Sequence, residues 1–175
     1  MAALRESRAG REAFFGRKHV GYANGLEPLA EALLRHGDHQ GALQAIDEAL
    51  WIYKRAGHER AASSVALRGV ILLADGHDGP LFPALKDLAD PLVERVAAIV
   101  AERIQQGIEP DAAYRMVGHL AGALDQRLGP DHPVTIDAFH NLAAQAPHRG
   151  ARHATIPATP IATRATTNRS RSRPV

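Results

Sequence analysis

Histidine is the residue type that most invites a metal or acid–base hypothesis in this sequence, since ten of its 175 residues are histidines. The closest pair is His36 and His39, which lie around a tight turn without a third ligand at metal-binding spacing. His119, His132 and His140 are spread over a predicted hairpin and the corner after it. We therefore predict polar turn positions for the close pair, and neither a metal site nor a metal cofactor.

Pairs of carboxylates are the second group of residues that could bind a metal ion or act in acid–base catalysis. Asp75 and Asp78 fall among turn-forming residues, but a calcium loop needs more oxygen ligands and a closing glutamate. Glu27 and Glu31 stand one turn apart on a predicted helix, whereas general acid–base catalysis needs two carboxylates across a cleft. We interpret the first pair as part of a turn and the second as part of an exposed helix face.

Motifs for nucleophilic catalysis and phosphate binding are missing from the sequence. Serines are few, and neither a nucleophile elbow nor a glycine-rich phosphate loop is present. The absence of cysteine excludes disulfides and thiolate metal sites, and it permits a reducing compartment. We therefore predict that the protein is not an enzyme and has no catalytic or cofactor-binding residue.

The composition favours helices over a sheet. The chain is 45% hydrophobic but only 5% aromatic, so alanine and leucine supply much of the apolar content and suit thin helical layers. The N-terminus has no apolar signal segment, and the run from Val65 to Ala74 is interrupted by Arg68 and too short to span a bilayer. We expect a cytoplasmic protein without a membrane partner.

The net charge of +2 conceals a division along the chain. Residues 1–20 carry a net charge of +3, residues 21–147 a net charge of −7, and residues 148–175 six arginines without an acid. An acidic body is not expected to form a basic groove for nucleic acid. The last segment has no helical apolar stripe and cannot bury enough surface to offset its ordering entropy, so we predict a disordered basic tail. The abrupt change of composition also allows a truncated or frame-shifted end.

The elements that would position any site are helices, and the most regular pair lies between Asn24 and Gly57. Apolar residues recur here at steps of three and four, which places them on one face of each helix. We predict that the first helix begins within two residues of Asn24, which caps it, with Pro28 in the first turn. Gly37 ends this helix in the left-handed conformation, and Asp38 caps the second, antiparallel helix. The packing residues are predicted to be Leu29, Leu33, Ile46 and Leu50.

Further helices follow at irregular intervals, because the turn glycines Gly37, Gly76 and Gly107 are not evenly spaced. Periodicity and turn signals delimit each helix. The predicted ranges outside the regular pair are 2–16, 59–74, a short helix within 81–89, 91–106, a helix capped by Asp111 that ends at Leu128, and a last helix from Pro133.

The regular pair carries small or apolar residues at Leu26, Leu29, Ala30, Leu33, Gly37, Ala42, Ile46 and Ala49. This pattern resembles the tetratricopeptide repeat (TPR), a helix hairpin in which small residues stand where helices touch and larger apolar residues fill the space around them. Lys54 stands in place of the usual terminal proline.

A second resemblance lies near residues 128–143, in the stretch LGPDHPVT and the following NLA. It is similar to the junction of kinesin-light-chain-type TPRs, commonly written LGPDHPDT, and Val134 replaces the usual acid. Gly129 ends one helix, the Gly-Pro-Asp-His-Pro run sets a rigid corner, and Pro133 suits the first turn of the next helix.

Together these patterns predict an all-α fold, a short right-handed α-solenoid of antiparallel helix hairpins with a disordered C-terminal tail. The expected organisation is an N-terminal helix or partial repeat over residues 1–20, a TPR-like helical domain over 21–147 and the disordered basic tail over 148–175.

The resemblance implies a protein-interaction scaffold that binds a peptide or partner protein in a mildly acidic groove lined by the first helix of each pair. The best-known groove of this family holds a C-terminal carboxylate with lysine and asparagine. Acids at the corresponding places here favour a basic or mixed peptide instead. The residues to which the resemblance carries partner-binding roles are Asn24, Glu27, Glu31, Leu34, Arg35 and Asn141.

Two other function classes stay open. The chain could be a fragment or sensor arm of a bacterial transcriptional or signalling regulator, although it contains no visible DNA-reading helix or nucleotide loop. The basic tail could bind nucleic acid or anionic lipid through charge alone.

Overall fold

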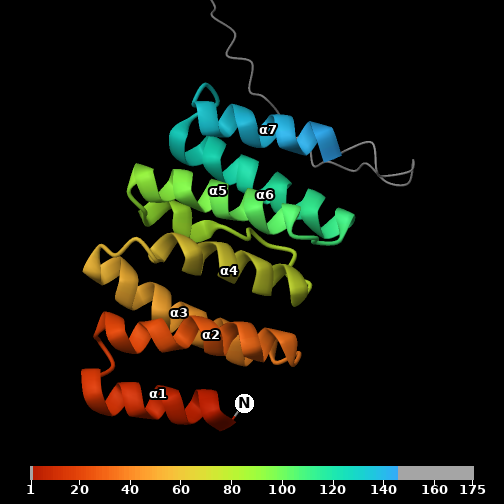
Figure 1. Ribbon diagram of the computed structural model, residues 1–175. Coiled ribbons are helices and arrows are strands. Elements are labelled where there is room, and N and C mark those ends of the chain that lie inside the picture. Colours follow the sequence, from red (N-terminus) through yellow and green to blue (C-terminus); the bar gives the residue numbers. More distant parts are fainter. Residues whose placement is uncertain (1, 146–175) are drawn as a thin grey trace, which may run out of the picture.

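The computed structural model describes residues 2–145, and this part of the chain is all-helical, without a strand (Figure 1). The predicted all-α class is thereby confirmed, whereas the tail over 148–175 lies outside the described residues. The elements are α1 (Ala2–Phe15), α2 (Val20–Arg35), α3 (His39–Ala56), α4 (Ala61–Ala74), the 3₁₀ helix η1 (Pro83–Asp87), α5 (Asp90–Gln105), α6 (Pro110–Leu128) and α7 (Pro133–Gln145).

The helices are stacked in chain order, from α1 at one end to α7 at the other (Figure 1). Each α-helix packs against the next α-helix along the chain, and α4 also contacts α6. One hydrophobic core continues between them, from Tyr22 on α2 to Ala138 on α7. No helix within residues 2–145 combines the length and the apolar character that crossing a membrane requires.

The hairpin of α2 and α3 forms where the sequence predicts it. Gly37 turns the chain with a left-handed φ of 77°, and Oδ1 of Asp38 accepts a hydrogen bond from a backbone N–H of the first turn of α3 at 2.9 Å. Asp38 is therefore the cap of α3, as predicted. The four predicted packing residues are all buried: Leu29, Leu33, Ile46 and Leu50.

The start of α2 differs from the prediction. The helix begins at Val20, and Nδ1 of His19 accepts a hydrogen bond from a backbone N–H of the first turn at 2.9 Å, so His19 caps it and Asn24 does not. Pro28 consequently lies inside the helix and not in its first turn. An internal proline costs a helix about 3 kcal/mol. Burial of the Tyr22 side chain in the added turn offsets part of this cost.

The ring of Phe82, in the segment after α4, packs against Gly69 of that helix. Gly69 is buried, and a Cβ atom placed on it would meet Cε1 of Phe82 at 2.6 Å. Phe82 is only 2% exposed, so its ring occupies the place that a side chain at position 69 would take. The helix predicted over 59–74 is confirmed, while the short helix expected within 81–89 is a 3₁₀ helix.

The helices α5, α6 and α7 form the far end of the stack. α6 begins at Pro110, where Oε2 of Glu109 accepts a hydrogen bond from a backbone N–H of the first turn at 3.1 Å. Glu109 is the cap, and the prediction of Asp111 is wrong because Pro110 already occupies the first helical turn. The corner after α6 turns at Gly129 with a φ of 91°, and α7 begins at Pro133 as predicted.

Candidate functional site

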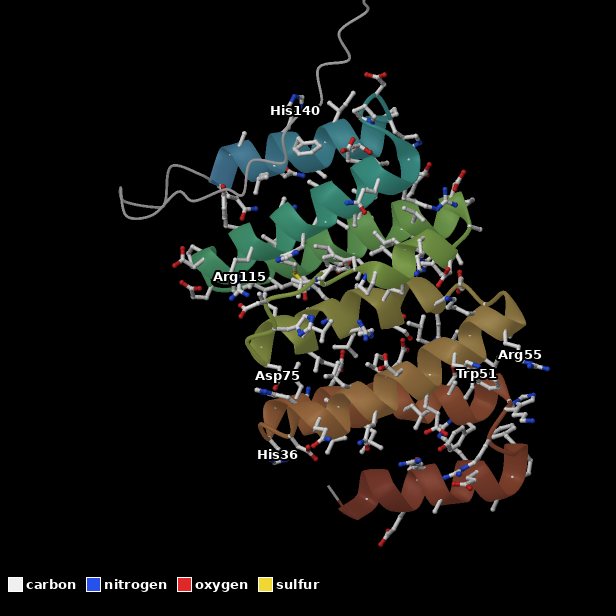
Figure 2. The ribbon with its side chains drawn as sticks, turned by 180° about the vertical axis from the view of Figure 1, so that it is seen from behind. His36, Trp51, Arg55, Asp75, Arg115 and His140 are labelled. Atoms are coloured by element: carbon white, nitrogen blue, oxygen red, sulfur yellow. The ribbon has the colours of Figure 1, made fainter. Side chains whose placement is uncertain are left out.

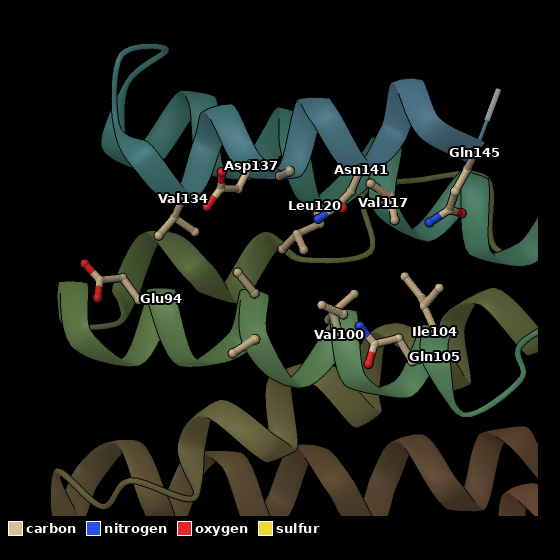
Figure 3. A pocket seen from close by; sticks show the side chains of 14 residues that line it. Glu94, Val100, Ile104, Gln105, Val117, Leu120, Val134, Asp137, Asn141 and Gln145 are labelled. Atoms are coloured by element: carbon tan, nitrogen blue, oxygen red, sulfur yellow. The ribbon is translucent and has the colours of Figure 1, made fainter.

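A groove opens between α5 and α7, with α6 as its floor (Figure 3). Its volume is about 360 Å³. α6 packs closely against α7 and less closely against α5, and α5 and α7 contact each other only slightly. Small side chains along the groove, such as Ala97, Ala101 and Ala138, add to this space.

The two ends of the groove differ in chemistry. Glu94 on α5 and Asp137 on α7 lie toward one end, while Gln105 and Gln145 lie toward the other and Asn141 stands between them on α7 (Figure 3). Among the described residues, no lysine or arginine lines the groove. The groove therefore offers negative charge at one end and amide groups along the rest of its length.

The surface between these polar groups is apolar. Val117 and Leu120 of α6 form the floor, and Val100 and Ile104 of α5 form one wall (Figure 3). A space of this volume falls within the range of ordinary ligand pockets, which are mostly apolar with a few placed polar groups. The groove can therefore hold apolar side chains of an extended segment while the carboxylates and amides bind its polar groups.

Asn141 is the member of the predicted partner-binding set that lies in this groove. Its side chain is exposed and stands in a row along α7 with Asp137 and Gln145 (Figure 3). The other five predicted residues belong to α2, at the opposite part of the stack (Figure 1). The structure therefore does not bring the six predicted residues together.

Glu27 is the most engaged of the predicted residues on α2. Oε1 accepts hydrogen bonds from the hydroxyls of Ser63 and Ser64 at 2.7 and 2.8 Å, and Oε2 accepts one from Arg60 at 3.2 Å. Ser63 and Ser64 belong to α4 and Arg60 is the residue at its N-cap, and the Glu27 side chain is 13% exposed. The carboxylate thus joins α2 to α4.

The remaining charged positions of α2 are more open. Oε1 of Glu31 lies 3.4 Å from a guanidinium nitrogen of Arg103 on α5, and the Glu31 side chain is 42% exposed. Leu34 is partly buried against the core, and Arg35 is exposed at the end of the helix. This face keeps a solvent-accessible acid and base, but it forms no part of the groove between α5 and α7.

Asn24 is held by a tyrosine of the neighbouring helix. The hydroxyl of Tyr53 on α3 donates a hydrogen bond to Oδ1 of Asn24 at 2.8 Å. Tyr53 is fully buried, and this burial raises its pKa from 10.0 to about 12. The Asn24 side chain therefore contributes an internal contact in place of the predicted cap.

The raised pKa of Tyr53 predicts a late tyrosine ionisation. The unfolded chain ionises this phenol near pH 10 and the folded chain near pH 12, so its contribution to stability is complete below pH 10 and is lost as the pH rises toward 12. Tyrosinate absorbance, recorded immediately after rapid jumps to a series of alkaline pH values, should show a component that ionises at a higher pH than free tyrosine. Tyr53→Phe should remove that component and Tyr114→Phe should leave it. A late component that survives Tyr53→Phe would contradict the assignment.

A second hollow, of about 540 Å³, lies between α1, α2 and α3. Four of its charged groups form two ion pairs, since Arg8 lies 3.2 Å from Glu48 and Arg17 lies 2.8 Å from Glu12, while Asp38 caps α3. The Arg8 guanidinium also donates to the hydroxyl of the buried Tyr22 at 2.9 Å. Although this hollow is larger, its polar groups hold α1 on the stack, and the groove between α5 and α7 is the better candidate site.

The part of the chain that the structure describes contains no group of three side chains placed to hold a metal ion. His36, in the turn after α2, and His140, on α7, lie far apart in the stack (Figure 2). Asp75 in the loop after α4 instead faces His39, with 3.2 Å between Oδ1 and Nδ1.

The groove contains four polar residues that sequence reasoning missed: Glu94, Gln105, Asp137 and Gln145. A usable signal was present on α7, where Asp137, Asn141 and Gln145 recur at steps of four and so share one helix face. No such signal connects α5 to α7, because their juxtaposition depends on how both pack against α6.

The TPR resemblance rests on sequence motifs alone. A comparison with protein-family models finds no match to the chain, and a comparison with curated proteins finds no significantly similar sequence.

Proposed function

We propose that the protein is a non-catalytic, TPR-like interaction scaffold, a short right-handed solenoid of helix hairpins that binds a peptide segment of a partner protein. The tight α2–α3 hairpin, the stacking of helices in chain order and the corner between Gly129 and Pro133 support this proposal. In such a scaffold the first helices of successive pairs line the binding surface, and α5 and α7 would hold these positions.

The observation that carries the proposal is the composition of the groove between α5, α6 and α7. Asp137 and Glu94 would receive a lysine or arginine side chain, and the apolar floor at Val117 and Leu120 would receive a neighbouring apolar side chain. The amide of Asn141 offers both a donor and an acceptor, as a peptide backbone requires. The expected ligand is therefore an extended segment that contains a base next to an apolar residue.

An array of short peptides of randomised sequence, probed with labelled protein, tests this function. The protein used is the full chain with the six tail arginines replaced by serine, here called the tail-serine variant, because a basic tail binds acidic peptides by charge alone. We expect the bound peptides to be enriched in a base beside an apolar residue. The replaced residues are Arg149, Arg152, Arg164, Arg169, Arg171 and Arg173.

Substitutions then locate the site. Asp137→Asn and Asn141→Ala should each weaken binding of a selected peptide by about five- to tenfold, the loss of one charged or polar contact. Glu31→Gln is the matched control, because it removes a carboxylate on α2 outside the groove, and it should leave the affinity unchanged. Failure to enrich any peptide class, or equal weakening by Glu31→Gln, would refute the proposed function.

A further inference from the structure

We propose that the groove between α5 and α7 has an intramolecular ligand, the arginine-rich segment of this same chain that follows α7. This inference rests on the proposed function of the groove and assigns its regulation. The segment would occupy the groove in competition with a partner peptide, and Arg149 and Arg152 would meet Asp137 and Glu94.

The point of attachment favours this ligand. Gln145 is the last residue of α7 and itself lines the groove, so the following residues start at its rim. Asp137 lies eight residues earlier on the same helix, about 12 Å away at a rise of 1.5 Å per residue. An extended chain covers about 3.3 Å per residue, so the four and seven residues that lead to Arg149 and Arg152 suffice for the return to Asp137.

The charges are complementary. Residues 146–175 contain six arginines and no acid, whereas the groove is lined by two acids and, within the described residues, by no base. Glu94 is about half exposed, and its nearest basic atom in the described chain is Nε2 of His132 at 3.9 Å. An incoming guanidinium can therefore reach this carboxylate without displacing a closer ion pair.

The covalent connection between α7 and the arginine-rich segment allows even a weak contact to occupy the groove. A segment joined by a short connection acts at an effective concentration on the order of millimolar, so even a modest intrinsic affinity keeps the groove partly occupied. A partner peptide must then displace the segment, and its apparent affinity falls by the occupied fraction. Replacing Arg149 and Arg152 by neutral residues would weaken the intramolecular contact and leave the groove open to a partner peptide.

A nitroxide label on the segment tests the contact directly. The natural chain has no cysteine, so Ala154→Cys in the full-length protein gives one labelling site. We expect the label to broaden the backbone amide signals of α5 around Glu94 and Ala98, and to leave α1 unaffected. The broadening should disappear with Glu94→Gln plus Asp137→Asn, and it should weaken at about 0.5 M salt, where charges are strongly screened.

Two matched variants separate a specific contact from general basicity. Arg149→Ser plus Arg152→Ser should abolish the broadening of α5, whereas Arg171→Ser plus Arg173→Ser removes the same charge further along the chain and should leave it. Equal broadening in both variants would overturn the inference. Loss in both would also overturn it, because charge alone would then be responsible.

Peptide binding distinguishes this inference from the proposed function. The tail-serine variant should bind a selected peptide at least about threefold more tightly than the natural chain, as expected on removal of a tethered competitor. Equal affinity together with no broadening of α5 refutes the intramolecular ligand and leaves the groove's function standing. Broadening of α5 with no peptide bound by the tail-serine variant supports the intramolecular ligand and refutes the proposed function.

Discussion

Glu27→Ala is expected to lower the free energy of unfolding by about 2–4 kcal/mol, because it leaves buried polar groups without a hydrogen-bond partner. The carboxylate accepts three hydrogen bonds, two from serines of α4 and one from Arg60 at its N-cap. Ser64 is fully buried, and without Glu27 its hydroxyl loses the acceptor it now uses. Arg60 would also lose its partner, although the exposure of its side chain makes that loss small.

Urea denaturation followed by helical circular dichroism measures this effect. Glu31→Ala is the matched control on the same helix, one turn away. Its carboxylate is 42% exposed and makes a single contact at 3.4 Å, so its removal should cost less than about 1 kcal/mol. Similar losses for the two variants would show that the link between α2 and α4 does not depend on the Glu27 carboxylate.

The hydrogen bonds of Glu27 make this residue unsuitable for a binding test. Charge reversal at Glu27 would place a base beside Arg60 and would destabilise the contact between α2 and α4. A loss of partner binding in such a variant would therefore report a change in folding. Substitutions at Asp137 and Asn141 avoid this ambiguity, since Asn141 is exposed and both line the groove.

Phe82→Ala is expected to cost about 3–5 kcal/mol, the usual penalty for emptying a buried aromatic site. The ring is 2% exposed and lies against Gly69 of α4. It joins the segment between α4 and α5 to the core, so its loss should loosen this segment as well. Thermal unfolding and hydrogen exchange of α4 and η1 measure the two consequences.

A double-mutant cycle with Gly69→Ala tests the contact itself. Alone, Gly69→Ala should destabilise the protein by about 1–2 kcal/mol, because the new methyl group meets a ring that cannot move away. In the Phe82→Ala background the same change should become neutral or stabilising, and the coupling should be at least about 1 kcal/mol.

The control for this cycle is another helical glycine. A Cβ atom on Gly122 of α6 meets nothing within 4 Å, so Gly122→Ala should stabilise the protein by about 0.5–1 kcal/mol through helix propensity. Additive effects at Gly69 and Phe82, or destabilisation by Gly122→Ala, would contradict this account.

The α2–α3 hairpin could be predicted closely from the sequence. Gly37 and Asp38 specify the turn through backbone freedom and a local hydrogen bond, and the apolar spacing places Leu29 and Ile46 inside. The start of α2 was missed because two local rules competed. Pro28 suggested that the first turn lies just before it, but the helix begins earlier, at Val20, where the added turn buries Tyr22.

The candidate site could be predicted only in part. Asn141 was identified through the resemblance of the corner before α7, and it does line the groove. Glu27 was predicted to face a ligand because its position in the repeat suggested an exposed surface. Whether a carboxylate on α2 meets water or a serine of α4 depends on the packing of the two helices, which no spacing within α2 encodes.

The helical class, most helix ranges, the turn at Gly37 and the corner at Gly129 follow from the sequence alone, because caps, glycine conformations and apolar periodicity act over a few residues. The contacts of Glu27 with α4, and the groove that Glu94 and Asp137 share, are visible only in the packed helices. These outcomes depend on the distances between helices far apart in the chain, and the packing of α5 and α7 against α6 sets those distances.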